Sequence, residues 1–132
     1  MKRLAYLALA AVMFFAFSSS LGAQRLKTKG QAWLDAHTDP AAINVAGNWY
    51  EHDWGTIALI QAKDSREVTG SGDGWDINGV VSGNKVYLLF SAHGEVMYSA
   101  ILTAVSNSDL NGSYEHGLMK EEGKGKRMDM TR

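Results

Sequence analysis

Residues 75–92 carry the sequence WDINGVVSGNKVYLLFSA, two apolar runs separated by Gly83 and Asn84. In the first run, Ile77 and Val81 belong to an alternation of apolar and polar residues, which is the period of a half-buried β-strand. A glycine-asparagine pair tolerates positive φ and is typical of a two-residue hairpin turn. The stretch therefore predicts two antiparallel strands joined by a tight turn.

The same pattern continues on both sides of this hairpin. From residue 46 onward, short apolar or alternating runs are separated by clusters of Gly, Asn, Asp and Ser. We predict strands at 46–52, 55–62, 66–72, 75–82, 85–92, 95–105, 109–116 and 125–132. Short connections favour an antiparallel up-and-down meander, and eight such strands can close into a barrel without free edges. The expected fold is therefore all-β, an eight-stranded antiparallel barrel over residues 46–132.

Two compositional details bear on how this barrel packs. Glycines within the predicted strands, which suit tight bends and inward crowding, are Gly70, Gly72, Gly79 and Gly112. The strands at 55–62, 85–92 and 95–105 are apolar on both faces for much of their length. Such strands need a cover outside the barrel, either from segment 24–43 or from a second copy docked on the fifth and sixth strands. The second option predicts a homo-oligomer.

The first 45 residues have a different character. Residues 1–23 begin with Lys2 and Arg3, continue with an unbroken apolar run and end in small residues, which is typical of a secretory signal peptide cleaved near Ala23. The apolar run is shorter than the roughly 20 residues of a membrane span, so we expect no stable span after cleavage. Residues 24–45 predict a linker with a short helix, in which Trp33 and Leu34 could instead plug an end of the barrel. The expected location is secreted or periplasmic.

Charge and cysteine content exclude several classes of function. Without Lys2 and Arg3 the remaining chain has 11 basic and 14 acidic residues, a net charge of −3, which disfavours nucleic acid as a partner. The chain has no cysteine, which excludes a disulfide framework and a cysteine nucleophile. Serine-hydrolase elbows, phosphate loops and zinc-protease motifs are missing from the sequence, so we expect no enzyme and no cofactor.

Residues 43–51, INVAGNWYE, resemble the G-x-W-Y-E opening of lipocalins. Together with V-T-G, I-N-G-V-V-S-G, L-N-G-S-Y and a terminal M-x-M-x-R, this stretch resembles small exported bacterial barrels of the calycin type, whose functions are mostly unassigned. Avidin-like barrels are a more distant likeness. The lipocalin resemblance implies a cup-shaped barrel whose base is closed by the motif's tryptophan, here Trp49. It also implies a basic residue packed on that ring, either Arg127 or Arg132.

Asp73, Asp76 and Asn78 lie among glycines in GSGDGWDINGVVSG, residues 70–83, as in a calcium-binding loop. An EF-hand alignment with Gly79 at the sixth position places Gly74 at the first position and a lysine at the twelfth, where acidic ligands are required. We therefore interpret the stretch as a hairpin turn leading into a strand.

The meander places alternate connections at opposite ends of the barrel, which brings three histidines to one rim: His52, His93 and His116. Imidazoles beside carboxylates are natural ligands of zinc and other transition metals, so these residues are candidate metal ligands. No close-spaced histidine pair supports the geometry, and solvated loop histidines are the alternative.

Aromatic and methionine side chains on the predicted inner face could line a small apolar cavity. The candidate ligand-binding residues are Trp75, Phe90, Tyr98, Tyr114 and Met128. The sequence favours an exported binding module for an apolar or amphipathic small molecule. The alternative is a protein-interaction or structural domain whose barrel is simply filled by these side chains.

Overall fold

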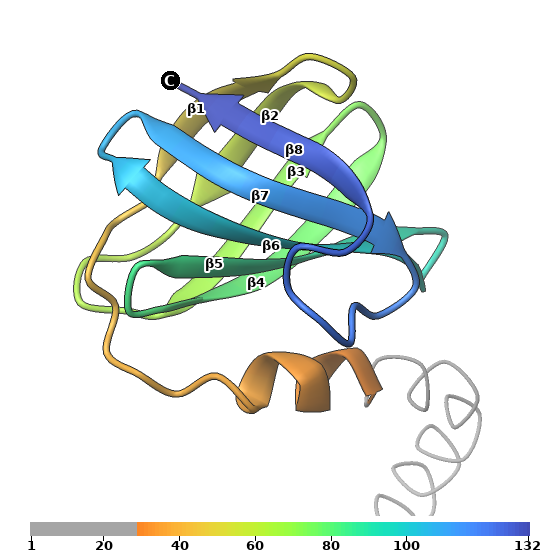
Figure 1. Cartoon of the computed structure of the whole chain (residues 1–132), viewed down its shortest axis with the longest axis horizontal. Helices are drawn as coiled ribbons and strands as arrows, with labels where there is room; N and C mark the ends of the chain where they lie inside the picture. The colour runs from red at the N-terminus through yellow and green to blue at the C-terminus, as the bar shows by residue number, and fades with distance from the viewer. Residues whose placement is uncertain (1–28) are drawn as a thin grey trace, which may run out of the picture.

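The computed structural model describes residues 29–132, which fold into a closed barrel of eight antiparallel strands (Figure 1). The strands are β1 (Gly47–Glu51), β2 (Gly55–Ile60), β3 (Glu67–Gly72), β4 (Trp75–Ser82), β5 (Lys85–Ala92), β6 (Glu95–Ser106), β7 (Asp109–His116) and β8 (Lys126–Thr131). Each strand pairs with the next, and β8 returns to pair with β1. The all-β meander and its closure, as predicted, are therefore confirmed. The predicted signal peptide and the first linker residues lie outside the described residues.

The observed strand ends lie within two residues of the predicted ones. The largest difference is at β2, which ends at Ile60. The cause is the buried side chain of Gln61, whose oxygen accepts a hydrogen bond from the amide of Val45 at 2.8 Å and whose nitrogen donates to the carbonyl of Ser65 at 2.8 Å. Because this amide ties the lead-in of β1 to the β2–β3 connection, the backbone leaves the ladder there.

Consecutive connections alternate between the two ends of the barrel. We name the end with connections 52–54, 73–74, 93–94 and 117–125 the mouth, and the opposite end the base. The turn at Asp73 and Gly74 has φ values of 46° and 83°, and the turn at His93 and Gly94 has 53° and 79°. Positive φ at both central residues is the geometry that matches the twist of antiparallel strands. The acidic stretch 70–83 therefore forms the predicted hairpin turn and strand.

A single apolar core fills the interior of the barrel. The predicted inward faces are confirmed at Ile77 and Val81 of β4, at Leu110 of β7, and at Met128 and Met130 of β8, all of which are buried in this core. Burial of these side chains is the main stabilising term for a chain that contains no cysteine.

Gly112 of β7 marks the closest approach of neighbouring strands. A Cβ atom there would lie 2.0 Å from the carbonyl oxygen of Ile101 on β6, far inside van der Waals contact. An added Cβ would also meet a backbone oxygen at 2.2 Å for Gly70, 2.8 Å for Gly72 and 2.5 Å for Gly79. The crowding predicted for the four strand glycines is confirmed.

A second apolar cluster lies outside the barrel. A short helix, residues 29–35, lies outside the barrel beside β4 and β5 (Figure 1). Its Leu34 packs against buried side chains on the outer face of β4–β6. Gly30 allows close packing, because a Cβ atom there would lie 2.9 Å from Cδ1 of Leu89. Trp33 and Leu34 therefore cover the outer wall of the barrel, which is the role predicted for segment 24–43. They do not plug an end of the barrel, which was the other prediction for these two residues.

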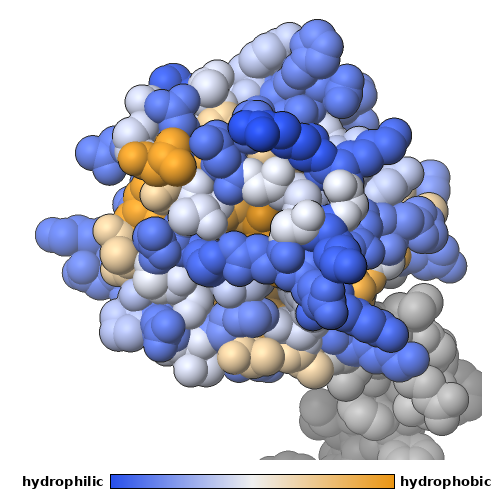
Figure 2. All heavy atoms as spheres, in the orientation of Figure 1, coloured by the Kyte–Doolittle hydropathy of each residue, from blue (hydrophilic) through white to orange (hydrophobic). Residues whose placement is uncertain are grey.

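Hydrogen bonds fasten this outer cover to the barrel. The indole nitrogen of Trp33 donates to the carbonyl of Met119 at 2.8 Å, and the amide of Met119 donates to the hydroxyl of Ser99 on β6 at 2.8 Å. The chain itself thus occupies the outer face of β5 and β6 through which a homo-oligomer was expected. On the face seen in Figure 2, hydrophilic side chains predominate and hydrophobic ones form small separate patches.

Within residues 29–132, no helix has both the length and the apolar composition that crossing a membrane requires.

Candidate functional site

Trp49 closes the base of the barrel. Its ring is 1% exposed, and its indole nitrogen donates to the carbonyl of Val45 at 2.8 Å. The guanidinium carbon of Arg132 lies 4.4 Å from the centre of the Trp49 ring, within range of a cation–π interaction. The same guanidinium donates to the backbone carbonyls of Asn44, Ala46 and Asn107. Of the two arginines considered from the sequence, Arg132 therefore packs on Trp49, whereas Arg127 pairs with Asp129.

The middle of the barrel contains no open space beside two of the predicted ligand residues. Phe90 and Met128 are both 0% exposed. A side chain that bordered a cavity large enough for a water molecule would keep accessible surface toward it. In this structure Phe90 and Met128 are core residues, and the space available to a ligand lies nearer the mouth.

An aromatic group fills the mouth of the barrel. Trp75, Tyr98 and Tyr114 are partly buried and pack on the core from β4, β6 and β7. Trp54, from the connection between β1 and β2, lies in the midst of them and also contacts Phe90. The structure thus brings four of the five predicted ligand residues into one group, with Trp54 as the additional, unpredicted member.

The carboxylate of Glu51 fixes the backbone that carries Trp54. Glu51 is the last residue of β1 and is buried. One of its oxygens accepts hydrogen bonds from the amides of Asp53 and Trp54, at 2.7 and 2.6 Å. Hydrogen bonds to an ionised acceptor are about twice as strong as neutral ones, so this side chain defines the conformation of the turn.

A pocket of about 320 Å³ opens beside this aromatic group, between β6, β7 and β8. Its walls are Tyr98, Tyr114, Glu115, His116, Gly125 and Lys126. Tyr98 pairs with His116 across β6 and β7, and Tyr114 pairs with Lys126 across β7 and β8. Directly paired residues point to the same face of a sheet, so these four side chains lie on the inner face at the mouth. We name this space the mouth pocket.

The three candidate metal-ligating histidines do not converge. His52 and His93 are exposed in separate mouth connections, and His116 packs edge-on against Tyr98, with ring centres 5.3 Å apart. Among residues 29–132, no three histidine, aspartate or glutamate side chains come close enough to share one metal ion. His116 instead belongs to the mouth pocket.

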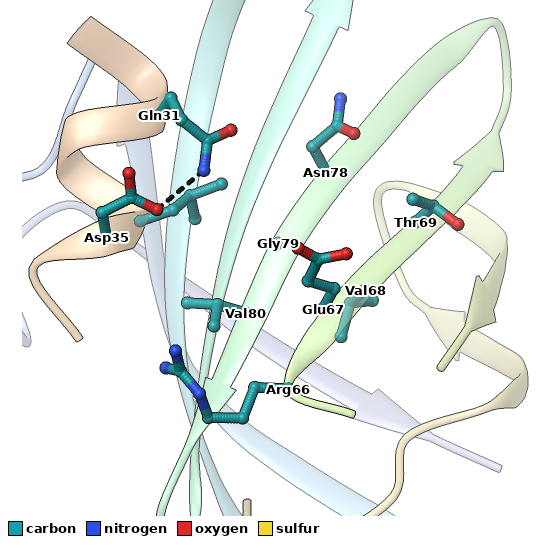
Figure 3. Close-up of a pocket in the computed structure, with 10 residues that line it drawn as sticks. Gln31, Asp35, Arg66, Glu67, Val68, Thr69, Asn78, Gly79 and Val80 are labelled. Carbon is teal, nitrogen blue, oxygen red and sulfur yellow. Dashed lines mark hydrogen bonds between the residues drawn. The ribbon is translucent and has the colours of Figure 1, made fainter. Parts of the chain in front are cut away.

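Two further clefts lie outside the barrel, alongside the short helix. They have volumes of about 210 and 520 Å³ and share Gln31, Leu34 and Asn78. Figure 3 shows the smaller cleft, where the side chain of Gln31 donates to Asp35 and the side chains of Arg66 and Glu67 lie nearby. Neither cleft is lined by an aromatic ring, in contrast to the mouth pocket.

A second aromatic group belongs to the outer cover. The ring of His37 stacks on Tyr87, with centres 3.6 Å apart and planes at 11°, and Trp33 meets both rings edge-on. Burial lowers the pKa of His37. Burial likewise raises the pKa of Tyr87, against an opposing effect of Lys85 and with a smaller contribution from Glu122 and Asp39 in the same direction. Burial in the outer cover is the main cause of both shifts.

Trp54 and Lys126 are the site residues that the sequence predictions missed. Trp54 follows two polar residues and precedes a glycine in His52-Asp53-Trp54-Gly55, so a large apolar side chain in a turn was the available signal. Lys126 shares the alternation of Met128 and Met130 in the predicted strand 125–132, which was the available signal, but it also belongs to a charged stretch typical of an exposed loop.

Comparisons of the chain with protein-family models, with curated proteins and with solved structures return no match.

Proposed function

We propose that this protein is an exported binding module that holds a small amphipathic molecule at the mouth of its barrel. The observation that carries the proposal is the mouth pocket, in which Tyr98 and Tyr114 offer apolar ring surface and Lys126 offers a cationic group. Ligand sites commonly combine apolar walls with a few polar groups that fix orientation. The volume of about 320 Å³ lies at the small end of such sites.

Two further features support the proposal. The segment 1–23 has the composition of a signal peptide, which supports export. The contact of Arg132 with Trp49 closes the base, so the mouth is the accessible end of the barrel. The same contact supports the proposal that the chain is a calycin-type barrel, since it is the one that the lipocalin resemblance implies.

A structural or protein-interaction domain is the second candidate. The observation in its favour is the filled interior, where Phe90, Met128 and Met130 retain no accessible surface. A barrel of eight strands has an interior just wide enough for its own side chains. In that case the mouth pocket would be a surface depression without a ligand.

Titration with anilinonaphthalene sulfonate, an apolar aromatic anion, separates the two candidates. We expect saturable binding to the purified protein, followed by fluorescence, and a loss of affinity of about fivefold in Lys126→Glu, because the cationic group is replaced by a repelling one. The matched control is Lys63→Glu, an exposed lysine at the base. Equal affinity in all three proteins, or an equal loss in the control, would contradict a ligand site at the mouth.

Native mass spectrometry of the protein purified from its own host then addresses the natural ligand. The expected result is an added mass that is released when the protein unfolds and that is reduced in Lys126→Glu. A spectrum of the bare chain under conditions that preserve a control complex favours the structural candidate.

A further inference from the structure

The side chain of Trp54 is surrounded by the other four rings of the mouth. The centre of its ring lies 4.4 Å from Phe90, 5.6 Å from Trp75, 5.4 Å from Tyr98 and 5.2 Å from Tyr114. Its plane is tilted by 36° from that of Phe90, while the two tyrosines meet it at 89° and 87°. The indole therefore lies above Phe90 as a floor and between tyrosines as walls.

The four surrounding rings form a box that does not depend on Trp54 for its walls. Trp75 contacts Tyr98 at 5.5 Å and Tyr98 contacts Tyr114 at 6.0 Å, both in edge-to-face geometry. Their backbones belong to β4, β6 and β7, and Phe90 belongs to β5, so the paired strands hold all four in place. We name these four residues the aromatic box.

Trp54 enters the box from a short connection and not from a strand. The last ladder pair of the β1–β2 hairpin is Glu51 with Gly55, so Trp54 lies beyond the regular pairing. It is only partly buried, whereas Phe90 beneath it is fully buried. Withdrawal of the indole thus requires loss of ring contacts and of the bonds from the turn to Glu51, without disruption of any strand pair.

The contacts of the indole with the box are apolar and ring-to-ring. Among residues 29–132, the indole nitrogen of Trp54 makes no hydrogen bond to a protein acceptor, in contrast to the nitrogens of Trp33 and Trp49. Edge-to-face and offset contacts depend on ring shape and quadrupole, which other flat aromatic molecules share. The box is therefore complementary to a flat ring system and not to tryptophan alone.

We infer that the aromatic box is a binding site for a planar aromatic molecule of about the size of indole, and that Trp54 occupies it in the ligand-free protein. This inference rests on the proposed function, since it names the ligand class for the same end of the barrel. Tyr98 and Tyr114 line both the box and the mouth pocket. A ligand would place its flat ring in the box and a polar substituent in the mouth pocket, toward Lys126.

Removal of the indole tests whether the box accepts a free aromatic ring. In Trp54→Ala the box is vacated, and we expect added indole to raise the midpoint of thermal unfolding by roughly 10 °C at about one hundred times its Kd. The matched control is Trp33→Ala, which removes another partly buried indole from the outer cover. No rise in Trp54→Ala, or an equal rise in Trp33→Ala, would overturn the inference.

The wild-type protein tests whether a ligand can displace the side chain of Trp54 from the aromatic box. In spectra that resolve the four indole N–H signals, we expect added indole to shift the signal of Trp54, assigned by its absence in Trp54→Ala. The signal of Trp49, bonded to Val45, should stay in place. Indole could stabilise Trp54→Ala and yet leave the Trp54 signal of the wild-type protein unchanged. That result would mean that Trp54 is a permanent core residue, which overturns the inference.

The two proposals fail separately. If anilinonaphthalene sulfonate binds at the mouth and depends on Lys126, while indole neither rescues Trp54→Ala nor shifts Trp54, the proposed function stands and the aromatic box is not a site. If no probe binds the wild-type protein, both fail.

Discussion

Trp49 and Trp54 lie in the same stretch of chain, yet they fill opposite ends of the barrel by different means. At the base, Trp49 is fixed by a hydrogen bond to Val45 and by the guanidinium of Arg132. At the mouth, Trp54 is held by contacts with other aromatic rings, the nearest being Phe90 at 4.4 Å. The indole of Trp49 has directional partners, whereas the indole of Trp54 contacts only other rings.

The two ends therefore differ in how narrowly their contacts define the side chain that fills them. A hydrogen bond and a cation–π contact specify a particular side chain in a particular orientation. Ring-to-ring contacts are less specific, because any flat aromatic surface can supply them. The base is therefore built as a structural closure, and the mouth has the chemistry expected of an exchangeable occupant.

The largest expected effect comes from deleting each tryptophan in turn. Trp49→Ala should lower the free energy of unfolding by about 4 kcal/mol, since it removes a fully buried ring. Trp54→Ala should cost only about 2 kcal/mol, because Trp54 is partly exposed and lies outside the ladder. Denaturant unfolding, monitored by circular dichroism, measures both. Equal losses would remove the distinction between the two ends.

Glu51→Ala should loosen the mouth alone. The carboxylate bonds two amides of the turn, so its removal should cost about 2 kcal/mol and speed hydrogen exchange at Asp53 and Trp54. Glu51→Gln, which keeps an acceptor oxygen but not the charge, should cost about half as much. Faster exchange at Trp49 as well would show that the two ends are not independent.

Arg132→Ala should weaken the base by a smaller amount, about 1 kcal/mol, since it removes one cation–π contact and hydrogen bonds at an exposed position. Arg127→Ala is the matched control, because it removes the same charge from the same region of the chain but lies away from Trp49. The control should leave stability nearly unchanged. Similar unfolding curves for the two variants would contradict the role assigned to Arg132.

The smallest expected effect is the change in stability with pH that His37 causes. His37 belongs to the outer cover and not to the base or the mouth of the barrel. Burial places the pKa of folded His37 below its ordinary value of 6.5. The unfolded chain therefore takes up the proton first, and the stability that neutral His37 contributes is present above pH 6.5 and declines as the pH falls below it. His37→Phe keeps a ring for stacking on Tyr87 but cannot titrate.

Comparison of the two proteins at pH 8 and pH 5.5 isolates this contribution. The wild-type protein should lose more stability than His37→Phe as the pH falls, with the difference confined to that window. Parallel losses would show that protonation of His37 does not matter to the cover.

Much of the barrel is predictable from the sequence, because strands and turns are local. The alternation in Trp75–Ser82 and the pair Gly83 and Asn84 predict a hairpin without reference to any distant residue. The ends of β4, β5 and β7 match the prediction residue for residue. The difference at β2 arises from Gln61, whose partners lie in other segments and leave no local signal.

The site is predictable only in part, because alternation along a strand reports which face a side chain lies on but not what surrounds it. Period-2 alternation correctly assigns Tyr98 and Tyr114 to the inner wall, but it cannot tell a residue that borders a pocket from one that is packed on all sides. Phe90 and Met128 follow the same pattern and are fully buried. The three histidines reach the mouth as expected, yet their distance from one another depends on side-chain direction, which alternation does not report.

Local chemistry along the chain determined the strands, their turns, their inward faces and the outer apolar stripe that needed a cover. Closure of the barrel decided what meets at each end. Contact of Trp54 with Phe90 and Tyr114 depends on the register between strands that are far apart in the sequence. It also depends on the conformation of the β1–β2 turn, whose amide at Trp54 donates a hydrogen bond to Glu51. Such contacts are a property of the closed sheet, because only closure sets the distance between β1 and the strands across the barrel from it.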